Sequence, residues 1–143
     1  MPNGQMDKQL TQMAGEYLVA AHLCLSGYVA FLTWKNYPKV DVFCLNPNNN
    51  RQVPIQVKTT RGHNQYHIPE IVDAADPTYV FVRINPDNIQ YYVVPAVTVA
   101  ELSELERQEY LQAHPNAQAE QPRMLSVNRI ENFQNRWDLL NLD

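Results

Sequence analysis

Two runs of residues that favour β-strands, separated by a short polar turn, constrain the fold of this chain most strongly. Residues 40–45 and 52–58 are rich in β-branched and aromatic side chains, the composition typical of strands. Residues 46–51 between them comprise four Asn, one Pro and one Arg, which turn the backbone at little cost. The pattern predicts a β-hairpin.

Three polar side chains should meet on one face of this hairpin. Side chains alternate along a strand, so Gln56 and Lys58 point to one face and Ile55 and Val57 to the other. In a paired hairpin, Asp41 lies opposite this part of the second strand. A carboxylate, an amide and an ammonium group are therefore predicted to converge.

These groups have the chemistry of a metal site. The Asp41 carboxylate is a hard oxygen ligand suited to Mg²⁺ or Mn²⁺, and either the Gln56 amide or the Val57 backbone carbonyl offers a second oxygen. Lys58 would orient or deprotonate a water molecule, or stabilise negative charge on a phosphate.

An amphipathic helix is predicted at residues 7–26, before the hairpin, and Gly27 provides a natural C-terminal stop. Glu16 lies in the middle of this helix. A glutamate on a helix is usually a solvated surface residue, so the sequence leaves two interpretations of Glu16 open: a surface residue or a member of the predicted site.

Further strands and a second helix are predicted along the chain. The order is helix, three strands, loop, two strands and helix. The remaining expected elements are a strand at 28–34, a helical turn at 68–75, a second hairpin at 79–84 and 90–95, an acidic amphipathic helix at 97–112, and an apolar C-terminal segment that docks onto the core.

Residues 59–67 are polar and aromatic without a clear period, which favours an active-site loop. Thr59, Thr60, Arg61 and His63 provide the hydroxyl, guanidinium and imidazole groups that commonly contact nucleic-acid backbones. The alternative is an ordinary surface loop.

The charge distribution is uneven. Residues 1–67 contain six Lys or Arg and three acids (+3), whereas residues 68–143 contain five and twelve (−7), which together give the net charge of −4. The basic half contains the predicted site, together with Lys35 and Lys39, which we include among the candidate DNA contacts. Chance clustering of surface charge is the alternative.

The chain contains no apolar run of about 18 residues, and its first twelve residues are polar. We expect a single cytoplasmic domain spanning residues 1–143, since this length suits one hydrophobic core.

The order of the site residues resembles that of a known group of enzymes. A helix glutamate (Glu16), a strand aspartate (Asp41) and the triplet Gln56-Val57-Lys58 resemble the PD-(D/E)XK nuclease superfamily. The Gln-x-Lys variant is similar to group I intron homing endonucleases and their small relatives. The resemblance implies an α/β, restriction-endonuclease-like core with a mixed central sheet of about five strands flanked by helices.

The resemblance also implies a metal-dependent DNA endonuclease that uses Mg²⁺ or Mn²⁺ and acts as a homodimer. Asp41 would be the metal-bridging carboxylate, and Gln56 would occupy the second acidic position, beside the Val57 carbonyl. Lys58 would be the catalytic lysine, and Glu16 would assist the metal or the water.

Two other interpretations remain open from the sequence. The first is a catalytically weak or inactive nuclease-like domain that binds nucleic acid or a protein partner, because Gln56 brings no negative charge to attract a cation. The second is an unrelated α/β domain in which Asp41 and Lys58 form a structural ion pair.

Overall fold

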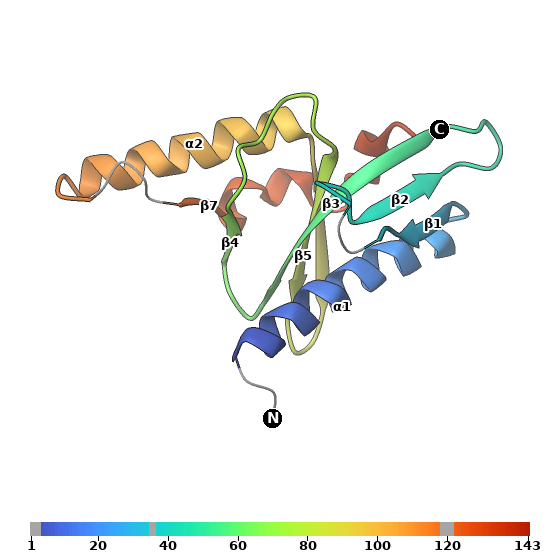
Figure 1. The fold of residues 1–143 in the computed structure, drawn as a ribbon, viewed down its shortest axis with the longest axis horizontal. Helices are drawn as coiled ribbons and strands as arrows, with labels where there is room; N and C mark the ends of the chain where they lie inside the picture. The colour runs from blue at the N-terminus through green and yellow to red at the C-terminus, as the bar shows by residue number, and fades with distance from the viewer. Residues whose placement is uncertain (1–3, 35–36, 118–121) are drawn as a thin grey trace.

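A mixed five-stranded sheet forms the centre of the molecule (Figure 1). A computed structural model describes residues 4–34, 37–117 and 122–143. The strands lie in the order β1-β2-β3-β5-β6, and all neighbours are antiparallel except the parallel pair β3 and β5. Their bounds are β1 Val29–Leu32, β2 Val42–Leu45, β3 Gln52–Arg61, β5 Thr78–Ile84 and β6 Ile89–Val94. The predicted fold class is confirmed.

The predicted first hairpin is present as strands β2 and β3. Its turn occupies residues 46–51 as expected, and Asn50 adopts a left-handed backbone conformation with a φ of 60°. Val42 pairs with Ile55. Just before that pair, the Asp41 amide donates a hydrogen bond of 2.9 Å to the Ile55 carbonyl. This register places Asp41 next to the second half of β3.

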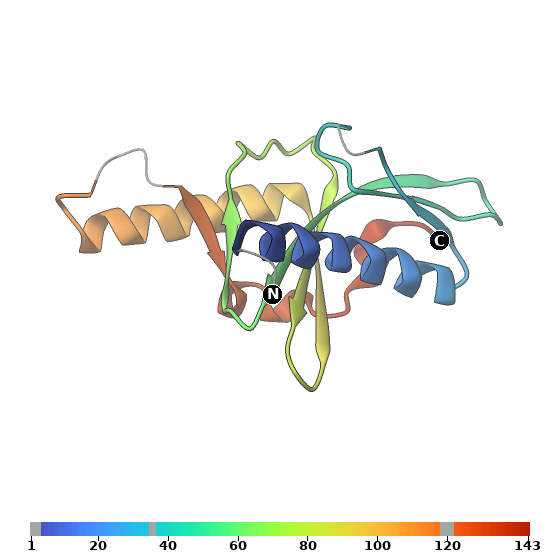
Figure 2. The same cartoon turned by 60° about the horizontal axis from the view of Figure 1, so that its bottom comes forward.

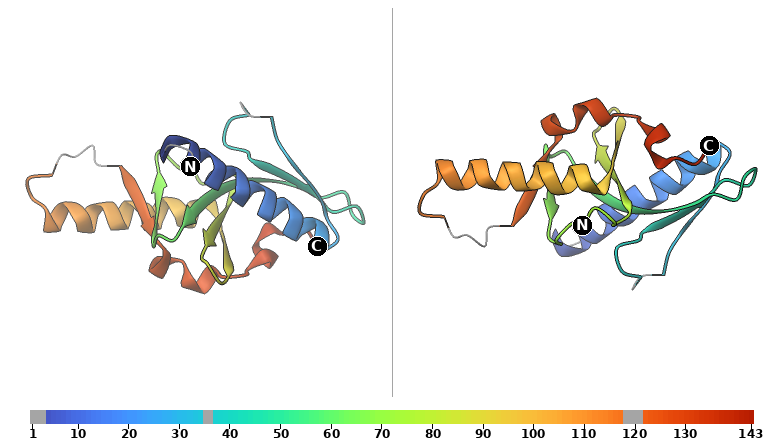
Figure 3. Two further views of the ribbon diagram at one scale, coloured as in Figure 1. Left: turned by 90° about the horizontal axis from the view of Figure 1, so that it is seen from below. Right: turned by 90° about the horizontal axis from the view of Figure 1, so that it is seen from above.

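Helix α1 (Gly4–Leu25) crosses one face of the sheet (Figure 3). Its buried residues Val19 and Leu23 join a core formed by apolar side chains of β2, β3, β5 and β6. The C-terminal residues Leu140 and Leu142 are buried in the same core, and the Trp137 ring stacks on His22 of α1 at 4.3 Å. Docking of the C-terminal segment is thus confirmed.

A second core lies on the opposite face, under helix α2 (Ala96–Ala113). A small two-stranded sheet, β4 (Gln65–Ile68) with β7 (Arg123–Ser126), contributes to it. The C-terminal half of α2 projects beyond the central sheet (Figure 2). Three short 3-10 helices follow β7, at Val127–Arg129, Glu131–Phe133 and Trp137–Leu140.

The prediction of one loop over residues 59–67 is wrong. Strand β3 continues to Arg61 because its second half pairs with β5, and β4 begins at Gln65. Only residues 62–64 form the turn between β3 and β4. The two threonines are β-branched and suit a strand, but their polarity had suggested a loop. The helical turn expected at 68–75 is also wrong, since residues 69–77 form no helix and Ile68 ends β4.

No helix within the described ranges has the length and apolar character needed to cross a membrane.

Gly15 allows α1 to lie directly on β3. An ideal Cβ built at Gly15 would be 1.7 Å from Oγ1 of Thr59 and 2.8 Å from its Cβ. No side chain fits at this separation, so glycine at position 15 sets how closely the helix approaches the strand.

We predict that Gly15→Ala destabilises the protein by about 1–3 kcal/mol, the usual cost of overpacking a core. Alanine is the better helix residue by about 1 kcal/mol, so a net loss means that the steric clash outweighs helix propensity. Urea denaturation measures the effect. Adding Thr59→Ala, which removes the nearest atom, should recover part of the loss, and a Gly15→Ala protein as stable as the wild type would contradict this account.

Candidate active site

The predicted site lies where strands β2 and β3 separate. Pairing between them stops at Ile55, so the edge of β3 beyond this point lacks a neighbouring strand. Side chains complete the hydrogen bonds of Val57 instead. The Val57 amide donates to Oδ2 of Asp41 at 2.8 Å, and the Val57 carbonyl accepts from Nε2 of Gln12 at 2.8 Å.

Asp41 is fixed by two donors on β3. Its Oδ2 accepts hydrogen bonds from the Val57 amide and from Nε2 of Gln56, the latter at 2.9 Å. The carboxylate is therefore oriented before any ligand arrives. The structure brings Asp41 and Gln56 together, as the hairpin register predicted.

Glu16 approaches Asp41 from helix α1. The two carboxyl groups lie close enough to hydrogen-bond when one of them is protonated. Burial raises the pKa of Glu16, the neighbouring Asp41 raises it further, and the hydrogen bond from Gln12 at 3.2 Å opposes this. Burial likewise raises the pKa of Asp41, although the Val57 amide and the Lys58 ammonium oppose the shift. The pair thus carries negative charge that the protein leaves partly uncompensated.

Lys58 forms an ion pair with Glu70 rather than with Asp41. Its Nζ lies 2.9 Å from Oε1 and 3.1 Å from Oε2 of Glu70. In the described part of the chain, Lys58 and Asp41 form no ion pair, so the interpretation of these two residues as a structural pair is wrong. Lys58 still lies near enough to lower the pKa of Asp41.

Glu70 is held by a second donor, the Tyr79 hydroxyl, at 2.7 Å. Burial alone would raise the pKa of Glu70, but the hydrogen bonds from Lys58 and Tyr79 outweigh it and hold this pKa below its ordinary value. Glu70 is therefore an ionised partner of the Lys58 ammonium.

Sequence reasoning missed Gln12 and Glu70. Gln12 precedes Glu16 by one helical turn, so both share one face of α1, and that spacing was a usable signal. Glu70 lies in the irregular connection between β4 and β5. No local pattern distinguishes it, because only the fold brings it to Lys58.

The two threonines predicted to contact nucleic acid are enclosed. The side chain of Thr59 lies under α1, and its hydroxyl has no hydrogen-bond partner among the described residues. Thr60 is only 7% exposed. The Thr59 hydroxyl therefore cannot reach a phosphate in this conformation.

The basic candidates differ in their exposure. Arg61 is 67% exposed at its side chain and lies 3.8 Å from the carboxylate of Asp7, and His63 is exposed in the turn after β3. Lys39 forms a 3.0 Å ion pair with Asp76. Lys35 falls outside the described residues.

The oxygen donors that face one another here are few. Within the described ranges, no group of three or more His, Cys, Asp or Glu side chains gathers to hold a metal ion. A metal would rely on Glu16, Asp41, the Gln56 amide oxygen and the Val57 carbonyl. All four are hard oxygen donors of the kind that Mg²⁺ and Mn²⁺ bind.

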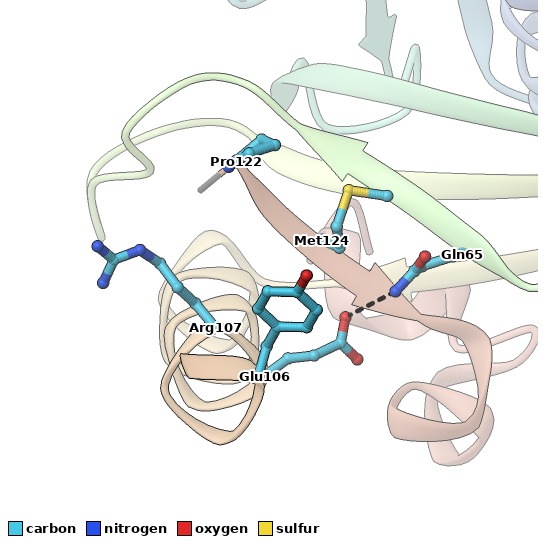
Figure 4. Close-up of a pocket in the computed structure, with 6 residues that line it drawn as sticks. Gln65, Glu106, Arg107, Pro122 and Met124 are labelled. Atoms are coloured by element: carbon cyan, nitrogen blue, oxygen red, sulfur yellow. Dashed lines mark hydrogen bonds between the residues drawn. The ribbon is translucent and has the colours of Figure 1, made fainter. Parts of the chain in front are cut away.

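A pocket between α2 and the small β4-β7 sheet lies apart from this site (Figure 4). Within it, Nε2 of Gln65 is 3.5 Å from Oε2 of Glu106. None of the predicted site residues contributes to it. Its lining residues are Gln65, Glu106, Arg107, Tyr110, Pro122 and Met124.

The sheet order and helix placement are those of a restriction-endonuclease-like fold. The chain is similar in structure to a Holliday junction resolvase, Hjc of Archaeoglobus fulgidus, with a TM-score of 0.50 and 10% identity over 91% of this chain and 95% of Hjc. A bacterial homing endonuclease, I-Ssp6803I, matches with a TM-score of 0.46 and 11% identity over 65% of this chain and 72% of that protein. No protein-family model matches the sequence, and no curated protein does so. At 10% identity the likeness to Hjc shows the fold alone.

We predict that stability depends on pH through the Glu16 and Asp41 pair. Both pKa values are raised on folding from ordinary values of 4.5 and 3.8, so the folded protein holds protons that the unfolded chain has released. Stability should therefore fall as pH rises from these values through the raised ones. Glu16→Gln removes one carboxylate and should raise the Tm near neutral pH, with less effect at about pH 4.

Thermal denaturation across this pH range measures the difference. The control is Glu101→Gln, which alters an exposed residue of α2 and should not change the pH dependence. An equal response in both variants would show that the effect is one of net charge alone.

Proposed function

We propose that this protein is a metal-dependent DNA endonuclease that hydrolyses phosphodiester bonds with Mg²⁺ or Mn²⁺. The observation that carries the proposal is the convergence of Glu16, Asp41, Gln56 and Lys58 at the open edge of β3. Hydrogen bonds fix Asp41 against β3, and the fold is one that nucleases use. Metal binding, catalysis and the DNA partner are all parts of this proposal.

The residues present fit a divalent cation. Burial raises the pKa of both Glu16 and Asp41, and Asp41 raises that of Glu16 further, while Lys58 is engaged by Glu70 instead of neutralising them directly. A cation between the two carboxylates would supply the missing charge. The Val57 carbonyl accepts a hydrogen bond from the Gln12 amide, and its second lone pair would serve as a further ligand.

Each residue has a role that follows from its position. Asp41 and Glu16 would hold the metal, with the Gln56 amide oxygen as a neutral ligand. When bound, such an ion lowers the pKa of water and stabilises charge on a phosphate. Lys58 provides a fixed ammonium group close to Asp41, suited to orienting the attacking water or to stabilising the developing charge.

The proposed DNA contacts are basic groups that flank these residues along the chain. Lys39 lies two residues before Asp41, and Arg61 and His63 follow Lys58 at the end of β3. Lys35 belongs to the same basic half of the sequence. A homodimer is part of the proposal, since one such site cuts one strand and cleavage of both strands of a duplex needs two.

A nuclease-like binding module with weak or no activity is the second candidate function. Gln56 favours it, because an amide in place of a carboxylate lowers the attraction for a cation. In the structure that amide donates to Asp41 and so stabilises the site in the absence of a metal. Metal binding and cleavage distinguish the two candidates.

We predict that Asp41→Asn and Lys58→Gln each reduce nicking of supercoiled plasmid by at least about 100-fold, the usual loss when one charge-stabilising group is removed. Both substitutions preserve hydrogen-bonding capacity, since Asn can accept from the Val57 amide and Gln can donate to Glu70. The assay compares initial nicking rates in Mn²⁺ and in Mg²⁺.

Lys8→Gln is the matched control, because it removes an exposed lysine of α1 that is not part of the site. Circular dichroism establishes that each variant is folded. Retained nicking in either folded site variant would refute the assignment, and salt-sensitive DNA binding by the wild type without nicking would favour the binding module.

We predict that Gln56→Glu tightens Mn²⁺ binding by about 10-fold, since a third carboxylate adds Coulomb attraction on the order of 1.4 kcal/mol. Isothermal calorimetry of the wild type, Gln56→Glu and Asp41→Asn measures this directly and does not depend on activity. Unchanged affinity in Gln56→Glu would show that position 56 does not contact the metal.

A further inference from the structure

The Lys58 ammonium is the best-held cation of the candidate site. Both carboxylate oxygens of Glu70 contact its Nζ, at 2.9 and 3.1 Å. The side chains are only 15% exposed for Lys58 and 21% for Glu70. Such an enclosed ion pair is more ordered than an exposed one.

Glu70 is itself anchored by the sheet. The Tyr79 hydroxyl donates to its Oε1 at 2.7 Å. Tyr79 lies directly across from Gln56 in the parallel pairing of β5 with β3, it is 2% exposed, and its ring stacks on Phe81 at 5.7 Å. The Lys58 ammonium is therefore held by Glu70, and Glu70 is held by Tyr79, a residue of the buried core.

We propose that Glu70 is a positioning residue: together with Tyr79, it holds the Lys58 ammonium in place for catalysis. A free lysine side chain samples many rotamers, and fixing it costs entropy at the moment of reaction. A carboxylate that fixes it in advance removes this cost from the barrier. This inference rests on the proposed nuclease function, in which Lys58 acts on the water or the phosphate.

The charge of Glu70 also reaches the metal ligands. Its carboxylate contributes to raising the pKa of Asp41, so it lies within electrostatic range of the proposed metal-binding residue. The ammonium of Lys58, which pairs with Glu70, has the opposite and larger effect on the pKa of Asp41.

The test compares Glu70→Gln and Tyr79→Phe with the wild type by two measurements. The first is the ¹⁵N-¹H signal of the Lys58 ammonium in the protein without metal or DNA, assigned by its absence in Lys58→Gln. The second is the single-turnover rate of plasmid nicking with Mn²⁺, measured as a function of DNA concentration.

For Glu70→Gln we expect loss of the slowly exchanging Lys58 ammonium signal. We also expect a fall of about 10- to 100-fold in the rate at saturating DNA, with the half-saturating DNA concentration unchanged or lower. Tyr79→Phe should show the same pattern more weakly. If Glu70 had a purely structural role, Glu70→Gln would lower stability. It would not lower the nicking rate while leaving the half-saturating DNA concentration unchanged.

Tyr66→Phe is the matched control. Tyr66 also packs on Phe81, with ring centroids 4.8 Å apart, but its buried hydroxyl has no hydrogen-bond partner in the described part of the chain. Removing that hydroxyl should leave the Lys58 signal and the nicking rate at wild-type values.

A Glu70→Gln protein that keeps both the ammonium signal and the rate would overturn the inference. So would an increase in rate, because Glu70 would then be withholding Lys58 from the substrate. If the wild type does not nick DNA, the proposed function fails, whereas the ammonium signal still decides whether Glu70 holds Lys58.

Discussion

The hydrogen bond between the Val57 amide and the Asp41 carboxylate is the interaction on which the candidate site depends. It forms where β2 stops pairing with β3, so a side chain replaces a missing strand. Gln12, on helix α1, donates a hydrogen bond to the Val57 carbonyl. The amide and the carbonyl of Val57 are thereby both satisfied, and polar groups from three parts of the chain meet at this residue.

The elements that were predicted correctly are those encoded by nearby residues. The hairpin turn and the alternation around Gln56 are local patterns, and they sufficed to place Asp41 beside Gln56. The continuation of β3 through Thr59 depends on pairing with β5, which no local pattern reveals. The pairing of Lys58 with Glu70 is likewise a product of tertiary structure, and the alternative in which Lys58 forms a structural ion pair with Asp41 was wrong for that reason.

The distribution of charge in the site follows from this arrangement. Glu16 and Asp41 face each other with raised pKa values, while Glu70, held by Lys58 and Tyr79, has a lowered one. Two carboxylates thus share an excess of negative charge, and the third is compensated within the protein. Functional sites typically hold neighbouring acids whose pKa values are shifted in opposite directions. Here the direction of each shift depends on the element that carries the acid.

The contact between Gly15 and Thr59 has a consequence for the geometry of the candidate site. Gly15 is adjacent to Glu16, and Thr59 is adjacent to Lys58, so the helix-to-strand spacing at this contact also sets the separation of the carboxylates across the site. A residue with no side chain therefore sets how closely the backbone that carries Glu16 approaches the strand against which Asp41 is fixed, and a larger residue at position 15 would move that part of the helix away from the strand.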